Sequence, residues 1–160
     1  VAALGSVAIV DFSDVHLIIV DDAATACDLA DAKGCYAPDT RTILVGADED
    51  GWYTTVVAHE FLHHVWARDH LADDEALVAA LAALDTPGSL LHRVIDDSYR
   101  DAYGDAPATE RFAYACTDLK PAQQGTAVAG VCARYLDVAA LPVSQSFTSD
   151  DIVAGITPQP

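Results

Sequence analysis

The chain has no methionine, only two lysines and little positive charge of any kind among its 160 residues. Eight Lys and Arg stand against 25 Asp and Glu, which gives a formal net charge of −17 at pH 7. A field of that sign repels phosphate backbones and anionic lipid, so we expect neither nucleic acid nor a membrane surface as a partner. Long apolar runs are also missing, because none approaches the ~18 residues that suggest a membrane span. We therefore expect no membrane insertion by this chain.

Because methionine is missing even at position 1, we expect a processed or excised product, with any signal peptide or anchor upstream. The hydrophobic fraction of 52% excludes a disordered chain. A length of 160 residues suits one compact domain and leaves little room for two. We predict a single domain over residues 1–160, with residues 141–160 as a peripheral tail, and a monomer.

The four cysteines fall into two pairs whose members are close in sequence. We expect disulfides Cys27–Cys35 and Cys116–Cys132, although four cysteines allow three pairings. A zinc site made of cysteines is disfavoured, because the chain has no CxxC spacing. Two disulfides indicate an oxidising compartment, so we predict an extracellular or cell-surface protein.

Strand patterns come first along the chain and helical patterns follow. Two short β-branched segments, 15–20 and 41–45, predict strands, with a helix over 23–30 capped by Asp22 and a turn at 35–38 between them. Helices are predicted over 52–68, 74–84, 89–99, 107–119 and 123–136. This order predicts a small α+β domain, with a short N-terminal β-sheet followed by a helical region.

The sequence His59-Glu60-Phe61-Leu62-His63 is an HExxH pattern on one of the predicted helices. Residues i and i+4 share one helix face, so both imidazoles can reach one metal ion. Zinc lowers the pKa of a bound water from ~15.7 toward ~7, and Glu60 is placed to take its proton during attack on a carbonyl. The alternative is a surface helix in which these residues coincide by chance.

A catalytic zinc site usually has three protein ligands, so a third must be found. Asp69 has the spacing used by another large group of zinc proteases, but the chain lacks the glycine that group needs for its turn. His70 lies about 10 Å beyond His63 along the helix axis, which is too far to share the ion, and Glu75 resembles a first-turn acid of the next helix. Glu110 is the stronger candidate, because it lies in an apolar segment where a carboxylate needs a partner or a metal. The alternative is that Glu110, like Glu75, is a first-turn acid of its helix.

The HExxH segment and the segment around Glu110 together resemble a known protein family. HEFLH, followed 47 residues later by ERFAYA, resembles the gluzincin metallopeptidases related to the catalytic domain of anthrax toxin lethal factor. The resemblance implies a small zincin-like domain in which His59, His63 and Glu110 bind zinc and Glu60 is the base. It also implies that Tyr103, seven residues before Glu110, assists catalysis.

Other residues keep open alternatives. Tyr99 and His92 compete with Tyr103 as donors to the transition state, and Tyr103 could instead cover apolar surface. His16 and His64 lack ligand spacing and are expected to be structural or surface residues. The strand at 41–45 is either an edge strand that pairs with an extended substrate or an interior strand.

These observations together predict a zinc-dependent metallopeptidase that acts on a peptide or protein. One alternative is a non-catalytic, regulatory domain that keeps zinc for structure. A second is a zinc hydrolase that acts on a non-peptide amide.

Overall fold

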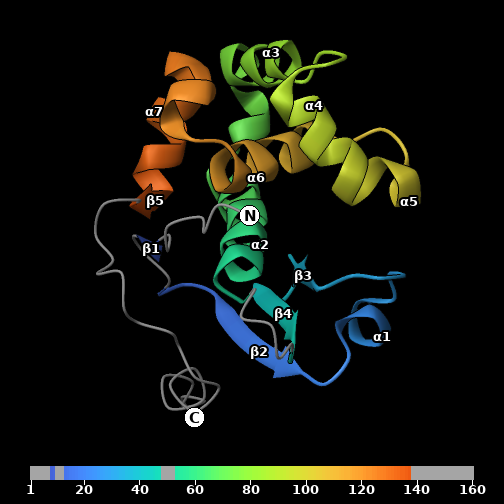
Figure 1. Cartoon of the computed structure of the whole chain (residues 1–160). Helices are drawn as coiled ribbons and strands as arrows, with labels where there is room; N and C mark the ends of the chain where they lie inside the picture. Colours follow the sequence, from blue (N-terminus) through green and yellow to red (C-terminus); the bar gives the residue numbers. More distant parts are fainter. Residues whose placement is uncertain (1–7, 10–12, 48–52, 138–160) are drawn as a thin grey trace.

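The structure is a computed structural model and describes residues 8–9, 13–47 and 53–137 (Figure 1). It has the mixed α+β architecture expected from the sequence, with a small sheet and a larger helical part. The predicted peripheral tail at 141–160 lies outside the described residues. None of the helices in the described ranges is both long and apolar enough to cross a membrane.

The sheet has three strands in the order β2-β4-β3. Strands β2 (His16–Val20) and β4 (Thr42–Gly46) are parallel and match the two predicted strands. Strand β4 is central, and its Ile43 and Val45 are almost fully buried. The interpretation of the 41–45 segment as an edge strand is therefore wrong, and the interior interpretation is right.

Strand β3 (Gly34–Ala37) occupies a segment that the sequence predicted as a turn. It pairs antiparallel with β4, with Cys35 opposite Leu44 and Ala37 opposite Thr42. The prediction failed because this four-residue strand is formed by its non-local pairing, and the proline that suggested a turn only follows its end. Within the described sheet, β3 is the edge strand that lies beside the helical part.

Helix α1 (Ala23–Cys27) is shorter than the predicted 23–30. Asp22 caps it as expected, since its carboxylate accepts a hydrogen bond from the backbone N–H of Thr25. Asp28 ends the helix early by adopting a left-handed conformation with φ of 53°. Aspartate tolerates this conformation better than most residues.

Helix α2 (Tyr53–Arg68) passes between the sheet and the other helices (Figure 1). Its buried apolar side chains are Ala58, Phe61, Leu62 and Val65, which follow the i, i+3, i+4, i+7 spacing of one helix face. This face anchors α2 in the core, and the HExxH residues are held on the same rigid helix.

The remaining helices form the layer on the far side of α2 from the sheet (Figure 1). They are α3 (Glu75–Leu84), α4 (Leu90–Ile95), α5 (Asp101–Tyr103), α6 (Ala108–Asp118) and α7 (Gly125–Tyr135). The predicted helix at 89–99 is α4, which continues through a π-helical turn (Asp96–Arg100) into α5. Two short strands that the sequence did not predict, β1 (Ala8–Ile9) and β5 (Leu136–Asp137), pair antiparallel.

Both expected disulfides are present. Cys27–Cys35 joins α1 to β3, and Cys116–Cys132 joins α6 to α7. The two disulfides are consistent with an oxidising compartment.

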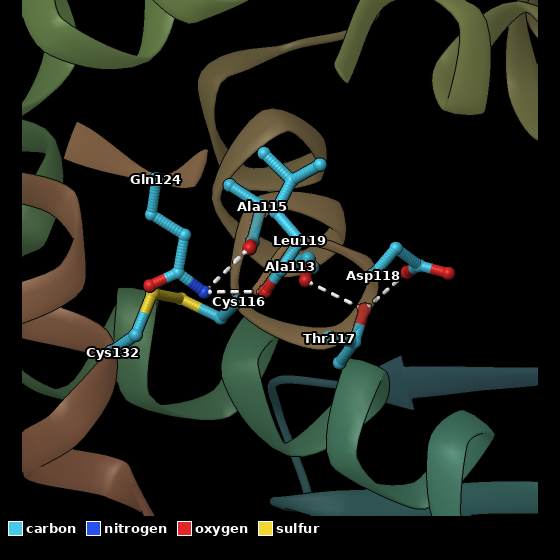
Figure 2. The surroundings of a disulfide bond; sticks show 8 residues. All are labelled: Ala113, Ala115, Cys116, Thr117, Asp118, Leu119, Gln124 and Cys132. Carbon is cyan, nitrogen blue, oxygen red and sulfur yellow. Dashed lines mark hydrogen bonds between the residues drawn. A yellow bond between two sulfur atoms is a disulfide. The ribbon is translucent and has the colours of Figure 1, made fainter. Parts of the chain in front are cut away.

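The C-terminal end of α6 is fixed by more than its disulfide (Figure 2). The buried Gln124 side chain donates hydrogen bonds from Nε2 to the carbonyls of Ala115 and Leu119, both at 2.9 Å. Carbonyls in the last turn of a helix have no partner within the helix, so this amide takes the place of a cap. The helix that carries Glu110 is thus held at its far end.

A charge cluster around Asp85 holds the start of α6 against the neighbouring helices. The Asp85 side chain is only 1% exposed and accepts hydrogen bonds from Arg100 and Arg111 at 2.6 Å. His92 Nδ1 lies 2.9 Å from the same carboxylate. Burial alone would raise the pKa of Asp85, but these partners outweigh it and lower the pKa. Arg111 follows Glu110 directly, so the cluster also positions that glutamate.

Candidate metal centre

The HExxH residues lie on α2 with both histidines facing the same side. One ligand atom from each of His59, Glu60 and His63 lies within 4.8 Å of the other two. The imidazole ring centroids are 4.9 Å apart. The three residues form a group that could hold a metal ion.

Helix α6 brings Glu110 to the same point from a distant part of the sequence. Its Oε2 lies 3.2 Å from Nε2 of His59, and its Oε1 lies 3.3 Å from Nε2 of His63. The two histidine side chains are 14% exposed and the Glu110 side chain is 16% exposed. Burial alone would raise the pKa of Glu110, but the hydrogen bonds and charges of the histidines bring it down to about 2.

These distances fit ligands of one metal ion. Zinc lies 2.0–2.2 Å from imidazole nitrogen and carboxylate oxygen, so two such ligands at a tetrahedral angle are about 3.3 Å apart. A hydrogen bond between nitrogen and oxygen is usually shorter, near 2.9 Å. The observed 3.2 and 3.3 Å are compatible with both arrangements, hydrogen bonds in the metal-free site and ligands that share one ion.

Thr109 fixes the orientation of His63. Its hydroxyl oxygen lies 2.8 Å from Nδ1 of His63. When Nδ1 carries the proton and donates to this hydroxyl, Nε2 is left as the metal ligand. Thr109 immediately precedes Glu110, so one short segment of α6 supplies both a candidate ligand and the residue that orients another.

Glu60 is buried beside the two histidines, with 8% of its surface exposed. Burial raises the pKa of this carboxyl, while the charges of His59 and His63 oppose the shift. Gly34 of β3 lies directly against this part of α2. A Cβ atom there would be 3.3 Å from Cγ of Glu60 and only 2.8 Å from Cγ1 of Val56, so the backbone of the edge strand approaches the HExxH helix closely.

Tyr114 covers the other side of His59. The two rings meet edge to face, with centroids 4.5 Å apart. Burial raises the pKa of the Tyr114 hydroxyl well above its usual range, and the charge of Glu110 adds to this. Tyr114 is one helical turn after Glu110, so the two share a face of α6.

The candidate metal ligands line a cleft of about 620 Å³. One wall is β3, through Gly34, Cys35 and Tyr36. The opposite wall comes from the helical layer and includes Tyr99, Tyr103, Tyr114 and Asp118. The cleft thus places a strand edge and a row of aromatic side chains on either side of the HExxH residues.

Comparison with family models, curated proteins and solved structures finds no match to this chain. The similarity to gluzincins therefore remains a prediction from the motifs. The geometry of the site has to carry any functional argument by itself.

The residues predicted to assist catalysis lie in different places. Tyr103 lines the cleft, but it is 39% exposed and its hydroxyl donates to the carbonyl of Ala30 across the cleft. Tyr99 is half-buried, and burial together with the charge of Glu110 raises its pKa. The Tyr99 and Tyr103 rings are 5.1 Å apart. His92 belongs to the Asp85 cluster and is not part of the cleft wall.

The other candidates for a third ligand have different surroundings. Asp69 accepts two hydrogen bonds from Arg68, at 2.7 and 2.8 Å, and one from Tyr135 at 2.7 Å. His70 is exposed, with a left-handed φ of 52°, and Glu75 is an exposed residue in the first turn of α3. None of these three belongs to the group of His59, Glu60 and His63 that could hold a metal ion; Glu110 is not in that group either, but it contacts both histidines.

His64 is a buried structural residue, as expected. Its Nδ1 lies 2.9 Å from the Tyr36 hydroxyl and its Nε2 lies 3.0 Å from Asp14. Because Tyr36 belongs to β3, this contact ties the edge strand to α2 beside the cleft. His16 is an exposed residue of β2.

Proposed function

We propose that this chain is a zinc-dependent metallopeptidase of the gluzincin type, in which His59, His63 and Glu110 bind zinc. The observation that carries the proposal is the placement of both Glu110 oxygens at 3.2 and 3.3 Å from the two Nε2 atoms. Two imidazoles and one carboxylate are a ligand set typical of catalytic zinc, because three protein ligands leave a coordination position for water. Zinc bound there would supply a water of lowered pKa and would polarise the substrate carbonyl.

Glu60 is the general base of the proposed reaction. Its carboxylate lies beside both histidines and belongs to a residue one position along the helix from His59, so it would be within reach of a water on zinc held by the histidines. It accepts the proton of the water that attacks the peptide carbonyl and passes it to the leaving amine.

The edge strand β3 is the proposed site for the substrate backbone. An extended peptide can add to a strand edge through main-chain hydrogen bonds. Gly34 supports this placement, because the lack of a side chain lets β3 run close to Glu60. A peptide paired with β3 would therefore pass directly over the candidate zinc ligands.

Tyr99 and Tyr103 are the candidates for the donor to the developing oxyanion. We favour Tyr99, because the charge of Glu110 acts on it and the Tyr103 hydroxyl is bound to the Ala30 carbonyl. Removal of one oxyanion donor typically lowers kcat about 10²- to 10³-fold. We expect that loss for Tyr99→Phe and a loss below tenfold for Tyr103→Phe; the reverse order would assign the role to Tyr103.

The substitution Glu60→Gln tests the proposed function. We expect this variant to bind zinc as the wild type does and to lose peptide hydrolysis. Wild-type protein that binds zinc but cleaves nothing in a diverse peptide library would favour the non-catalytic, regulatory alternative. Cleavage of a small acylated amine without any peptide cleavage would favour the non-peptide amide hydrolase.

The two disulfides support secretion or display at a cell surface as the proposed location. The net charge of −17 supports a protein or peptide partner over nucleic acid.

A further inference from the structure

Asp118 is an acidic residue of the cleft wall that the proposed reaction does not use. It is the last residue of α6 and lies on the side of that helix away from the Cys116–Cys132 disulfide (Figure 2). Helix α6 packs across α2, with Thr109 against His63 and Tyr114 against His59. Asp118 follows Tyr114 by one further turn on the same face of α6, and it lines the cleft together with Thr55, near the start of α2.

The Asp118 side chain has no Lys or Arg partner among the described residues. Its Oδ2 accepts a hydrogen bond of 2.5 Å from the Thr117 hydroxyl (Figure 2). Burial raises the pKa of this carboxyl, and neither that hydrogen bond nor the charge of His59 offsets the effect.

Two other acids of the described interior, Asp85 and Glu110, differ in this respect. Asp85 binds Arg100 and Arg111, and Glu110 faces two histidines. A half-buried carboxylate costs free energy unless a cation or several donors pair with it. Asp118 carries this cost while it lines the cleft that contains the metal centre. A positively charged group of a bound substrate would remove this free-energy cost.

We propose that Asp118 binds the positive charge of a Lys or Arg side chain of the substrate, next to the bond that is cleaved. This inference rests on the proposed function and specifies its substrate class. Eight residues of helix separate Asp118 from Glu110, which is about 12 Å along the axis. A Lys or Arg side chain together with one residue of extended backbone, at roughly 3.3 Å, spans most of that distance.

Two further features of the cleft suit a cationic side chain. Tyr114 and Tyr99 line the same wall, and aromatic faces bind both the methylene stem and the charged end of Lys or Arg. The net charge of −17 also raises the local concentration of cationic peptides and speeds their association.

A set of quenched fluorogenic peptides tests the inference. The peptides share one sequence and carry Arg, Lys, norleucine or Glu at each position beside the cleavage site in turn. At one position we expect the zinc-loaded wild type to prefer Arg or Lys over norleucine by about 10- to 100-fold in kcat/KM. Asp118→Asn should remove this preference, and Asp118→Lys should favour Glu. Asp31→Asn, which alters an exposed acid of the same cleft, is the matched control and should keep the preference.

The outcomes separate this inference from the proposed function. Equal cleavage of all peptides by the wild type would overturn the inference and leave the metallopeptidase proposal intact. Loss of cleavage of every peptide together with weaker zinc binding in Asp118→Asn would also overturn it, because Asp118 would then position His59. Binding in the Glu60→Gln background, followed by fluorescence anisotropy, tests Asp118 without catalysis. There the Arg peptide should bind more tightly than the norleucine peptide only when Asp118 is present, and equal binding would contradict the inference.

Discussion

Removal of the Thr109 hydroxyl should weaken metal binding although Thr109 is not itself a ligand. In Thr109→Val the side chain keeps its shape but loses the oxygen that lies 2.8 Å from Nδ1 of His63. Partners of this kind orient the ring and select its tautomer, and their loss typically costs 10- to 100-fold in metal affinity. That range corresponds to about 1.4–2.8 kcal/mol. Thr109 lies inside the first turn of α6 and the N-cap is Pro107, so the change removes no side-chain cap.

The assay is competition for zinc with a chromophoric chelator at fixed pH. Thr109→Ser is the matched control, because serine keeps a hydroxyl at the same position. We expect the serine variant to bind zinc within a few-fold of wild type and the valine variant to fall in the 10- to 100-fold range. Equal affinity of the valine variant and wild type, or equal losses in both variants, would refute the orienting role of the hydroxyl.

Three further predictions concern the scaffold around the site. Gly34→Ala places a Cβ 2.8 Å from backbone and side-chain atoms and should lower the free energy of unfolding by about 1–3 kcal/mol in chemical denaturation. Gly130→Ala is the control and should cause no such loss, because a Cβ there has no atom within 4 Å. Equal effects of the two substitutions would contradict the close approach of β3. Asp85→Asn should lower the free energy of unfolding by about 3–5 kcal/mol at pH 7. The folded pKa of Asp85 is lowered below the unfolded value of about 3.9, so the stability advantage of wild type over the variant should shrink as the pH falls through that lowered pKa. A stability difference that stays constant down to pH 2 would count against the cluster. Replacement of both Cys116 and Cys132 by serine should cost about 3 kcal/mol, measured by thermal unfolding without reductant, and an unchanged stability would show that the disulfide does not constrain the unfolded chain.

The HExxH part of α2 was predictable because its information is local. His59 and His63 share a face through helical spacing alone, and no other element is needed to bring them together. Glu110 lies 47 residues further on, and only its apolar surroundings and the resemblance of ERFAYA to the gluzincin motif favoured it in the sequence. The structure then brings it to the histidines through the packing of α6 across α2.

The cleft wall opposite α6 was not predictable from the same signals. Strand β3 is four residues long, and its pairing with β4 rather than its own pattern makes it a strand. The sequence left open whether the 41–45 segment is an edge or an interior strand, and the structure makes β4 central and β3 an edge strand, because strand order depends on long-range contacts.

Residues that assist the candidate ligands could have been found from helix geometry. Thr109 precedes Glu110, and Tyr114 and Asp118 follow it by one and two helical turns. Once Glu110 is assigned to the site, the same face of α6 should supply its neighbours. Of these residues of α6, only Glu110 was predicted from the sequence; Thr109, Tyr114 and Asp118 were not.

We expect Glu110 to complete a zinc site with the two histidines of α2, and zinc titration of two carboxylate variants measures whether it does. Isothermal calorimetry should give one zinc per chain for wild type and for Asp69→Asn, with similar affinity, since Asp69 is bound to Arg68 and Tyr135. Glu110→Gln should lose at least about 100-fold in affinity, because a neutral amide replaces a charged ligand. Retention of zinc by Glu110→Gln together with its loss in Asp69→Asn would contradict the account.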